Sequence, residues 1–128
     1  MSNVPEFRSK LWSQIKGDEV DELNIEGGFV DNVANFDSKF FKISPREASS
    51  MDPQQRFFLQ SCWKSIKNAG YSLKEISGTN TGVFGAVSTR DYHELAILFQ
   101  APVDPQLSTG LAHCILANRV SYILDLKG

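Results

Sequence analysis

Two histidines and two cysteines are the side chains of this sequence best suited to chemistry, as metal ligands, general bases or nucleophiles. A metal site needs three or four converging ligands, and neither His93 nor His113 has a partner at metal-ligand spacing. Cys114 directly follows His113, so the two side chains point to different sides of a helix. A cysteine nucleophile also needs a base and an oxyanion hole. Spacing therefore predicts no catalytic residue, no metal site and no cofactor.

Cys62 and Cys114 lie in apolar runs with helical spacing, where a thiol is buried and poorly ionised. Two cysteines without framework spacing predict reduced, packed thiols and hence a cytoplasmic localisation. Arg119 and Asp125 stand in or beside another apolar run, where a charge is costly unless it is paired. We expect an internal ion pair or capped carbonyls there, in preference to catalysis.

The elements that would position these residues centre on two consecutive helix starts. Ser44 and Asp52 are each followed by proline, and Glu47 and Gln55 stand three residues after them. The oxygen-bearing side chain can accept from the first turn, proline suits the first helical position, and Glu or Gln can bond back. The pattern predicts a capping box at both starts.

The second helix should run from Pro53 to about Ala69, with Gly70 closing it in the left-handed conformation. Apolar residues cover most of its circumference, which predicts a core helix covered on more than one side. The positions are Phe57, Phe58, Leu59, Cys62, Trp63, Ile66 and Ala69.

Residues 81–87 form a continuous small and apolar run, typical of a strand buried on both faces of an α/β sheet. The resulting helix–strand–helix order predicts an α/β layered fold, helix-rich with one or two short strands. The other expected elements are a surface helix at 5–16, an edge strand at 29–33, one helical turn at 73–76, a helix at 88–99 capped by Ser88, a loop at 100–106 and a helix at 109–124.

Composition excludes several classes of function. The 128 residues fit one domain or part of one, with 41% apolar and 22% charged residues. The 13 basic and 15 acidic residues are mixed along the chain, which argues against a nucleic-acid surface. No segment approaches the roughly 20 apolar residues of a membrane span.

The most distinctive motifs are Phe36-Asp37, Ile43-Ser44-Pro45-Arg46-Glu47-Ala48, Met51-Asp52-Pro53-Gln54-Gln55-Arg56, Trp63, Ala69-Gly70-Tyr71, Thr81-Gly82-Val83-Phe84, Thr109-Gly110, Ala117-Asn118-Arg119-Val120-Ser121-Tyr122 and Leu124-Asp125-Leu126-Lys127-Gly128. Together they closely resemble the first half of the β-ketoacyl synthase (ketosynthase) domain of modular type I polyketide synthases. The resemblance runs from about residue 27 to the end, so we divide the chain into a poorly matched segment, 1–26, and a ketosynthase-like part, 27–128. The run 112–116 looks most like synthases that recruit their acyltransferase in trans, although a serine is more usual at Cys114.

The resemblance implies a partial thiolase-like fold, a homodimer, and decarboxylative condensation of an acyl group with a malonyl unit on a phosphopantetheinyl acyl carrier protein. The family is a C–C bond-forming acyltransferase whose nucleophile lies in an Asp-Thr-Ala-Cys-Ser-Ser motif, with two histidines further on. That motif is not in this sequence, and His93 and His113 do not match the family's histidines. The family's opening Ile-Ala-Ile-Val-Gly-Met-like strand is also missing, which leaves Val83–Val87 without most of its expected neighbours.

Positions near the family's acyl tunnel and dimer contact are Ser88, Thr89, Tyr92, Leu107, Thr109 and Gly110. They could line an acyl pocket or serve only as core and interface, and the two interpretations stay open. Structural roles are expected for Ser44, Asp52, Pro53, Gln55, Trp63, Arg119 and Asp125.

The leading hypothesis is a ketosynthase fragment from a split or truncated gene, inactive alone because it lacks the catalytic cysteine and histidines. The alternative is a non-catalytic module that docks onto a synthase, a carrier protein or the complementary C-terminal half. An independent helical protein with another role is a third hypothesis.

Overall fold

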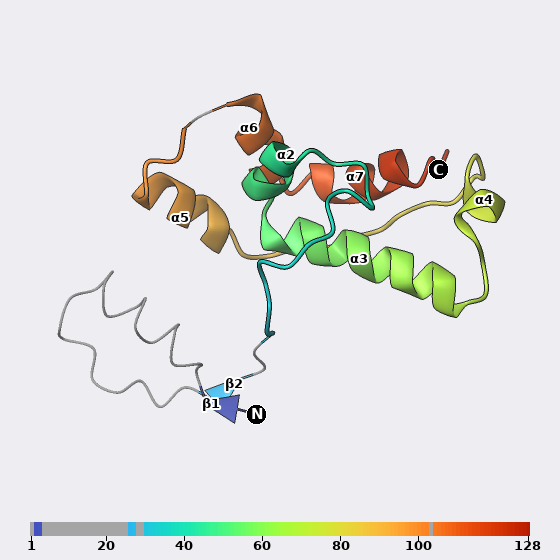
Figure 1. Ribbon diagram of the computed structural model, residues 1–128, viewed down its shortest axis with the longest axis horizontal. Coiled ribbons are helices and arrows are strands. Elements are labelled where there is room, and N and C mark those ends of the chain that lie inside the picture. Colours follow the sequence, from blue (N-terminus) through green and yellow to red (C-terminus); the bar gives the residue numbers. More distant parts are fainter. Residues whose placement is uncertain (1, 4–25, 28–29, 103) are drawn as a thin grey trace. The chain divides into compact units, whose positions relative to one another are not determined.

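The computed structural model describes residues 2–3, 26–27, 30–102 and 104–128, which belong to two compact units, 1–33 and 34–128. In the first unit β1 (Ser2–Asn3) pairs antiparallel with β2 (Glu26–Gly27) (Figure 1). The helix predicted at 5–16 lies outside the described residues, as does the beginning of the strand predicted at 29–33. Its described residues, 30–33, form a bend and the start of a turn instead of a strand.

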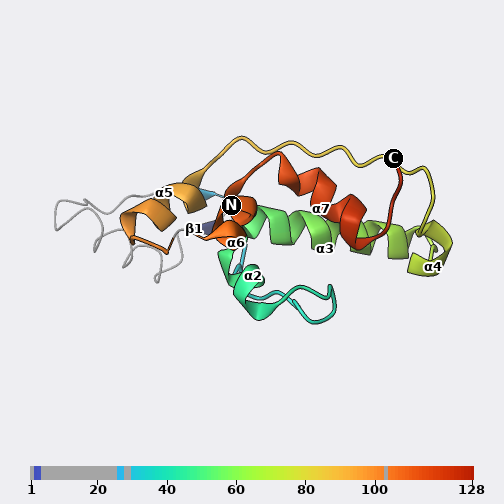
Figure 2. The ribbon, with the colours of Figure 1, turned by 90° about the horizontal axis from the view of Figure 1, so that it is seen from above.

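The regular secondary structure in the described residues of the second unit is entirely helical. Its elements are α2 (Pro45–Ser50), α3 (Pro53–Asn68), α4 (Leu73–Ile76), α5 (Asp91–Leu98), α6 (Pro105–Leu111) and α7 (Ile115–Ile123). Figure 2 shows α7 lying along α3, the longest of these helices, and α2 packs against α6. The single helical turn predicted at 73–76 is therefore confirmed as α4.

A small apolar core holds α2, α3 and α7 together. Leu59 of α3 and Val120 of α7 are almost completely shielded from solvent, as is Met51 in the connection between α2 and α3. The remaining buried apolar residues of this core are Phe41, Ile43, Ala48, Leu124 and Leu126. The Phe40 ring lies against that of Trp63 on α3, with centroids 5.3 Å apart, and thereby fastens the segment before α2 to α3.

Both predicted helix starts are confirmed, with proline in the first turn of each helix. The Ser44 hydroxyl accepts from the backbone N–H of Glu47 at 3.2 Å, and the Asp52 carboxylate accepts from that of Gln54 at 2.8 Å. The predicted return bonds of the capping boxes are not made. The side chains of Glu47 and Gln55 both turn to Arg119 of α7 instead.

The helix predicted from Pro53 to about Ala69 is α3, and Gly70 has the predicted left-handed backbone, with φ at +86°. Within the second unit α3 buries only Gln55 and Leu59 completely. The other apolar residues predicted to be covered are half-buried or exposed: Phe57, Phe58, Cys62, Trp63, Ile66 and Ala69. Only one face of α3 is therefore packed by the described residues of the second unit. The predicted packing of other elements against more than one side of α3 is not seen there.

The prediction of a strand at 81–87 is wrong. Residues 79–90 run as an extended segment without a sheet ladder, held near one end where Lys127 N–H donates to the Thr79 carbonyl at 2.8 Å. An apolar run becomes a strand only where a neighbouring strand accepts its backbone hydrogen bonds, and the described residues of the second unit supply no such strand. The two short strands of the described residues, β1 and β2, belong to the first unit. The described residues therefore show no α/β layering.

The helix predicted at 109–124 is two helices, α6 and α7, with a break at 112–114. Pro105, predicted to lie in a loop, begins α6, because the Asp104 carboxylate accepts from the Leu107 N–H at 2.7 Å and caps it. The helix predicted at 88–99 begins later, at Asp91, with Arg90 rather than Ser88 at the cap position.

Candidate functional site

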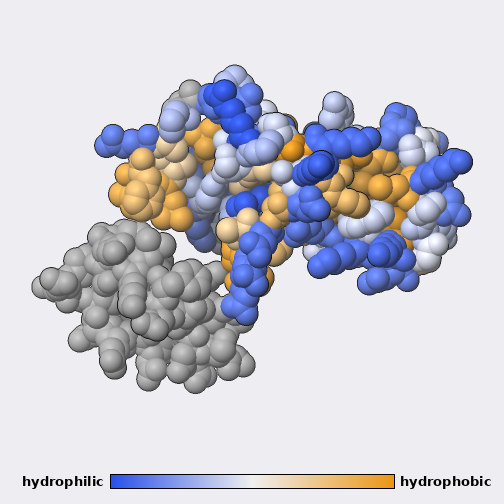
Figure 3. Space-filling model, in the orientation of Figure 1, coloured by the Kyte–Doolittle hydropathy of each residue, from blue (hydrophilic) through white to orange (hydrophobic). Residues whose placement is uncertain are grey.

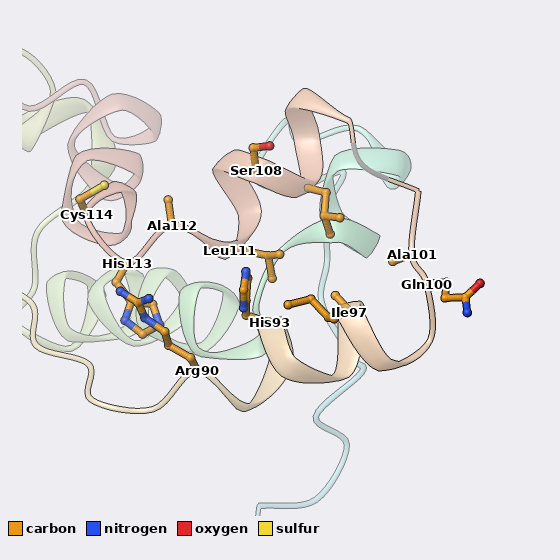
Figure 4. A pocket seen from close by; sticks show the side chains of 12 residues that line it. Arg90, His93, Ile97, Gln100, Ala101, Ser108, Leu111, Ala112, His113 and Cys114 are labelled. Atoms are coloured by element: carbon orange, nitrogen blue, oxygen red, sulfur yellow. The ribbon is translucent and has the colours of Figure 1, made fainter. Parts of the chain in front are cut away.

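A pocket of about 670 Å³ lies between α5 and the connection from α6 to α7. Figure 4 shows Arg90 and His113 toward one end, His93 and Leu111 in the middle, and Ile97 and Gln100 toward the other end. No acidic side chain is part of its lining, which is completed by Ala96, Gln100, Ala101, Leu107, Ser108, Ala112 and Cys114. The pocket is therefore mainly apolar with one basic margin, a lining that small-molecule sites commonly have.

Two of the six predicted pocket residues line cavities in the second unit. Leu107 borders the 670 Å³ pocket and also a neighbouring one of about 490 Å³, between α2 and α5. Tyr92 borders the second of these, and its hydroxyl donates to the Ser49 carbonyl at 2.9 Å. This hydrogen bond ties α5 to the end of α2.

The other four predicted residues lie outside both pocket linings. Ser88 is exposed in the segment before α5, and the Thr89 carbonyl accepts from the Gln54 amide at 3.2 Å. Thr109 is exposed on α6, whereas Gly110 is buried directly against the backbone of α2. Their part in an acyl pocket or a dimer contact stays a prediction.

Sequence reasoning assigned Gln55 a local capping role and missed its contacts with a distant turn. Its amide nitrogen lies 2.8 Å from the carbonyl oxygen of Gly110, 3.1 Å from that of Ala112 and 3.2 Å from that of Thr109. Two N–H bonds cannot serve all three oxygens fully, so the amide is shared among them. These are the carbonyls at the break between α6 and α7.

Arg119 forms the internal ion pair expected for it, with Glu47 as the partner. The guanidinium side chain is 9% exposed, and its Nε donates to the Gln55 side-chain oxygen at 3.0 Å. Asp125 behaves differently, because it is exposed and binds Lys127 and the Ser77 hydroxyl. These partners hold the pKa of the Asp125 carboxyl below its usual range, the bond from Lys127 first and that from Ser77 second.

The two thiols differ in their surroundings. Cys62 is half-buried on α3, where burial raises the pKa of its thiol. Cys114 was predicted to be buried mid-helix, but the break before α7 leaves it exposed at the cap position. Nε2 of the adjacent His113 is buried and has no hydrogen-bond partner among the described residues, so it offers Cys114 no ready proton relay.

No group of histidine, cysteine and carboxylate side chains in the described part of the chain could hold a metal ion. No helix among those residues is long and apolar enough to cross a membrane. The candidate functional features of the second unit are therefore the mainly apolar pocket and the buried polar cluster of Glu47, Gln55 and Arg119.

Comparison with known proteins identifies the family. Residues 2–128 match the model of the β-ketoacyl synthase N-terminal domain. This chain belongs to the β-ketoacyl synthase family. The family match extends over nearly the whole chain, which corresponds to the N-terminal part of a ketosynthase domain of polyketide synthases.

Relatives and solved structures agree with this assignment. The chain is 42% identical to polyketide synthase PksN of Bacillus subtilis over 132 residues, covering 100% of this chain and 2% of that protein. It is 45% identical to 6-methylsalicylic acid synthase of Aspergillus niger over 107 residues, 84% of this chain and 6% of the relative.

The fold resembles the ketosynthase from module 6 of the bacillaene synthase of Bacillus subtilis, with a TM-score of 0.72 and 29% identity. That match covers 99% of this chain and 20% of the other. The helical second unit is therefore part of a thiolase-like ketosynthase fold, and the chain spans only a small share of the proteins it matches.

Proposed function

We propose that this chain provides the N-terminal part of a ketosynthase that condenses an acyl group with a malonyl unit carried on an acyl carrier protein. The observation that carries the proposal is the family match over residues 2–128. We further propose that these 128 residues do not catalyse the condensation alone, since the printed sequence contains no Asp-Thr-Ala-Cys-Ser-Ser motif. A condensing enzyme needs a thiolate and its proton-transfer partners in one site.

Neither thiol of this chain replaces that nucleophile. Burial raises the pKa of the Cys62 thiol, so little thiolate forms there near neutral pH. Cys114 is exposed, but Nε2 of the neighbouring His113 is buried and makes no hydrogen bond to it. The 670 Å³ pocket would then hold an acyl group whose reacting end is attached to a cysteine on another segment.

Incubation of the purified chain with an acyl-thioester tests this proposal, with intact mass spectrometry and peptide mapping as the readout. We expect no stable acyl-enzyme and no decarboxylation of carrier-bound malonyl. The Cys62→Ser and Cys114→Ser variants identify any adventitious acylation. A stable acyl-enzyme at either cysteine, with turnover of malonyl, would overturn the claim of inactivity.

The finer assignments follow from the family. We propose that Leu107 and Tyr92 border the acyl chain, that Ser88, Thr89, Thr109 and Gly110 serve the pocket edge or a homodimer contact, and that the parent synthase recruits its acyltransferase in trans. Placement of Leu107 in two adjoining cavities supports the first of these.

A second candidate function is a non-catalytic module that docks onto a complementary ketosynthase half, a carrier protein or a synthase. The extended segment 79–90 favours it, because Phe84 there is 94% exposed. Figure 3 shows further apolar surface over α5 and along α3 and α7. Such surface is costly in water unless a partner covers it.

Co-expression with a C-terminal ketosynthase segment tests the docking function. We expect a soluble complex that co-elutes in size-exclusion chromatography, and Phe84→Ser should weaken it without lowering the stability of the chain alone. Exposed Lys74 of α4, changed to Ala, provides the control. A well-folded monomer that ignores the complementary segment would argue against docking.

A further inference from the structure

We infer that Gln55 and Arg119 are positioning residues that set the shape of the 670 Å³ pocket by fixing the break between α6 and α7. The pocket wall on that side is built from Leu111, Ala112, His113 and Cys114. None of these side chains forms a hydrogen bond with Gln55. The Gln55 side-chain amide instead positions them through the backbone carbonyls to which it donates. The inference rests on the proposed function only in taking this pocket as the place of the acyl group.

The sequence holds no strong local signal for the break beyond Gly110, which lies within α6 and does not have a positive φ. No proline lies between Leu107 and Ile115, and no residue of 107–115 has a positive φ. The apolar spacing also continues across it, which is why one helix was predicted. Physical causes of a helix end are few, and insertion of a side chain into the carbonyl ladder is one of them.

Gln55 supplies that inserted side chain. A continuous helix would bond the carbonyls of Thr109, Gly110 and Ala112 to N–H groups four residues on. Here all three oxygens lie within 3.2 Å of the Gln55 amide nitrogen, and the Gly110 carbonyl also accepts from Asp52 N–H at 3.0 Å. The carbonyls of Thr109 and Gly110 are therefore satisfied by the first turn of α3 and its cap, whereas that of Ala112 also accepts from the Ile115 N–H at 3.1 Å.

Arg119 fixes which way the Gln55 amide points. The Nε–H of arginine can only donate, so the atom of Gln55 that faces it at 3.0 Å must be the oxygen. The NH₂ group is then directed at the three carbonyls. Glu47 completes the chain by pairing with the same guanidinium. The Glu47 carboxylate on α2 thus orients the Arg119 guanidinium on α7. The guanidinium in turn orients the Gln55 amide on α3, and this amide holds the backbone of the pocket wall.

The test uses Gln55→Glu in the full chain. Glutamate keeps an oxygen for Arg119 but replaces the donor with an acceptor that faces three carbonyl oxygens. We expect amide exchange of residues 110–116 to quicken by about tenfold relative to α4, the scale of one lost buried hydrogen bond. The labelling rate of Cys114, but not of Cys62, should change with it.

Leu126→Ala is the matched control, because Leu126 is buried in the core away from the break. At an equal loss of thermal stability it should leave the relative exchange of 110–116 unchanged. Equal local effects in the two variants would overturn the inference. If Gln55→Glu does not fold, Arg119→Lys takes its place, since lysine keeps the charge for Glu47 but has no Nε–H of the same reach. Unchanged amide exchange of residues 110–116 in Arg119→Lys would also overturn the inference.

The outcomes separate this inference from the proposed function. Local loosening at 110–116 in Gln55→Glu, together with a stable acyl-enzyme and malonyl turnover on Cys62 or Cys114 of the chain alone, leaves the positioning role standing and contradicts the proposed function. A chain that stays unmodified by the acyl-thioester, with normal 110–116 exchange in Gln55→Glu, does the reverse.

Discussion

Arg119 Nε donates to the side-chain oxygen of Gln55 at 3.0 Å, across 64 residues of sequence, and this bond joins α7 to α3 in the interior of the second unit. Both residues are buried, and Glu47 of α2 pairs with the same guanidinium. The second unit has only a small buried apolar core, so its stability depends strongly on this polar connection.

The first prediction concerns the loss of that connection. Arg119→Ala should lower the free energy of unfolding by about 2–4 kcal/mol, because it leaves the Gln55 oxygen and a partly buried Glu47 without their partner. Urea denaturation measures the change. Arg46→Ala is the control: its ion pair with Asp104 is at the surface, the Arg46 side chain being 73% exposed, and the expected loss is below about 1 kcal/mol. Equal losses would contradict the structural role of Arg119.

The second prediction concerns the contact between α2 and α6. A Cβ atom at Gly110 would lie 2.2 Å from the Ser50 carbonyl oxygen, so Gly110→Ala must push the two backbones apart. We expect a loss of about 1–3 kcal/mol in unfolding free energy. At Gly82 the nearest atom is a ring carbon of Phe84 at 3.1 Å, and that exposed ring can turn aside. Gly82→Ala should therefore cost much less in the same melt, and the opposite ranking would refute this packing.

The third prediction concerns pH. The Leu107 N–H, followed by Arg46, holds the pKa of the Asp104 carboxyl below its usual range. A lowered folded-state pKa means that the carboxylate form favours the native state, so its contribution is present above the unfolded pKa of about 4 and is lost as the pH falls through the folded pKa. The stability difference between the wild type and Asp104→Ala, measured by urea midpoints, should shrink on acidification below about pH 4. A difference independent of pH would exclude this linkage.

The fourth prediction concerns the thiols. Cys114 is exposed, whereas burial raises the pKa of the Cys62 thiol, so a thiol reagent near neutral pH should label Cys114 faster. Peptide mapping at short reaction times measures the ratio. In concentrated urea the two rates should converge, which tests whether the difference comes from the fold. Faster labelling of Cys62 in the native chain would contradict its burial on α3.

Local signals in the sequence were sufficient for the helix starts. The oxygen-bearing residue before proline at Ser44 and at Asp52 predicts α2 and α3, because capping depends on neighbours within one turn. The same signal at Asp104 before Pro105 marks α6, although the two prolines of that segment suggested a loop.

Long-range effects were not visible in the sequence. The capping-box pattern cannot reveal that Glu47 and Gln55 find a better partner 72 and 64 residues away. Likewise, the apolar run 81–87 specifies a strand only in the presence of a neighbouring strand, and the break between α6 and α7 is imposed by Gln55 from another helix. The candidate pocket depends on that break, so its basic margin and its Cys114 edge could not be predicted from spacing.

Acyl-enzyme formation in a mixture of this chain and a complementary C-terminal ketosynthase segment, followed by intact mass spectrometry, tests the central claim most directly. The account predicts that the chain alone remains unmodified by an acyl-thioester, and that the mixture acquires one acyl group on the complementary segment's cysteine and then consumes carrier-bound malonyl. A complementary segment that is acylated and condenses equally well without this chain, or a chain that condenses alone through Cys62 or Cys114, would contradict it.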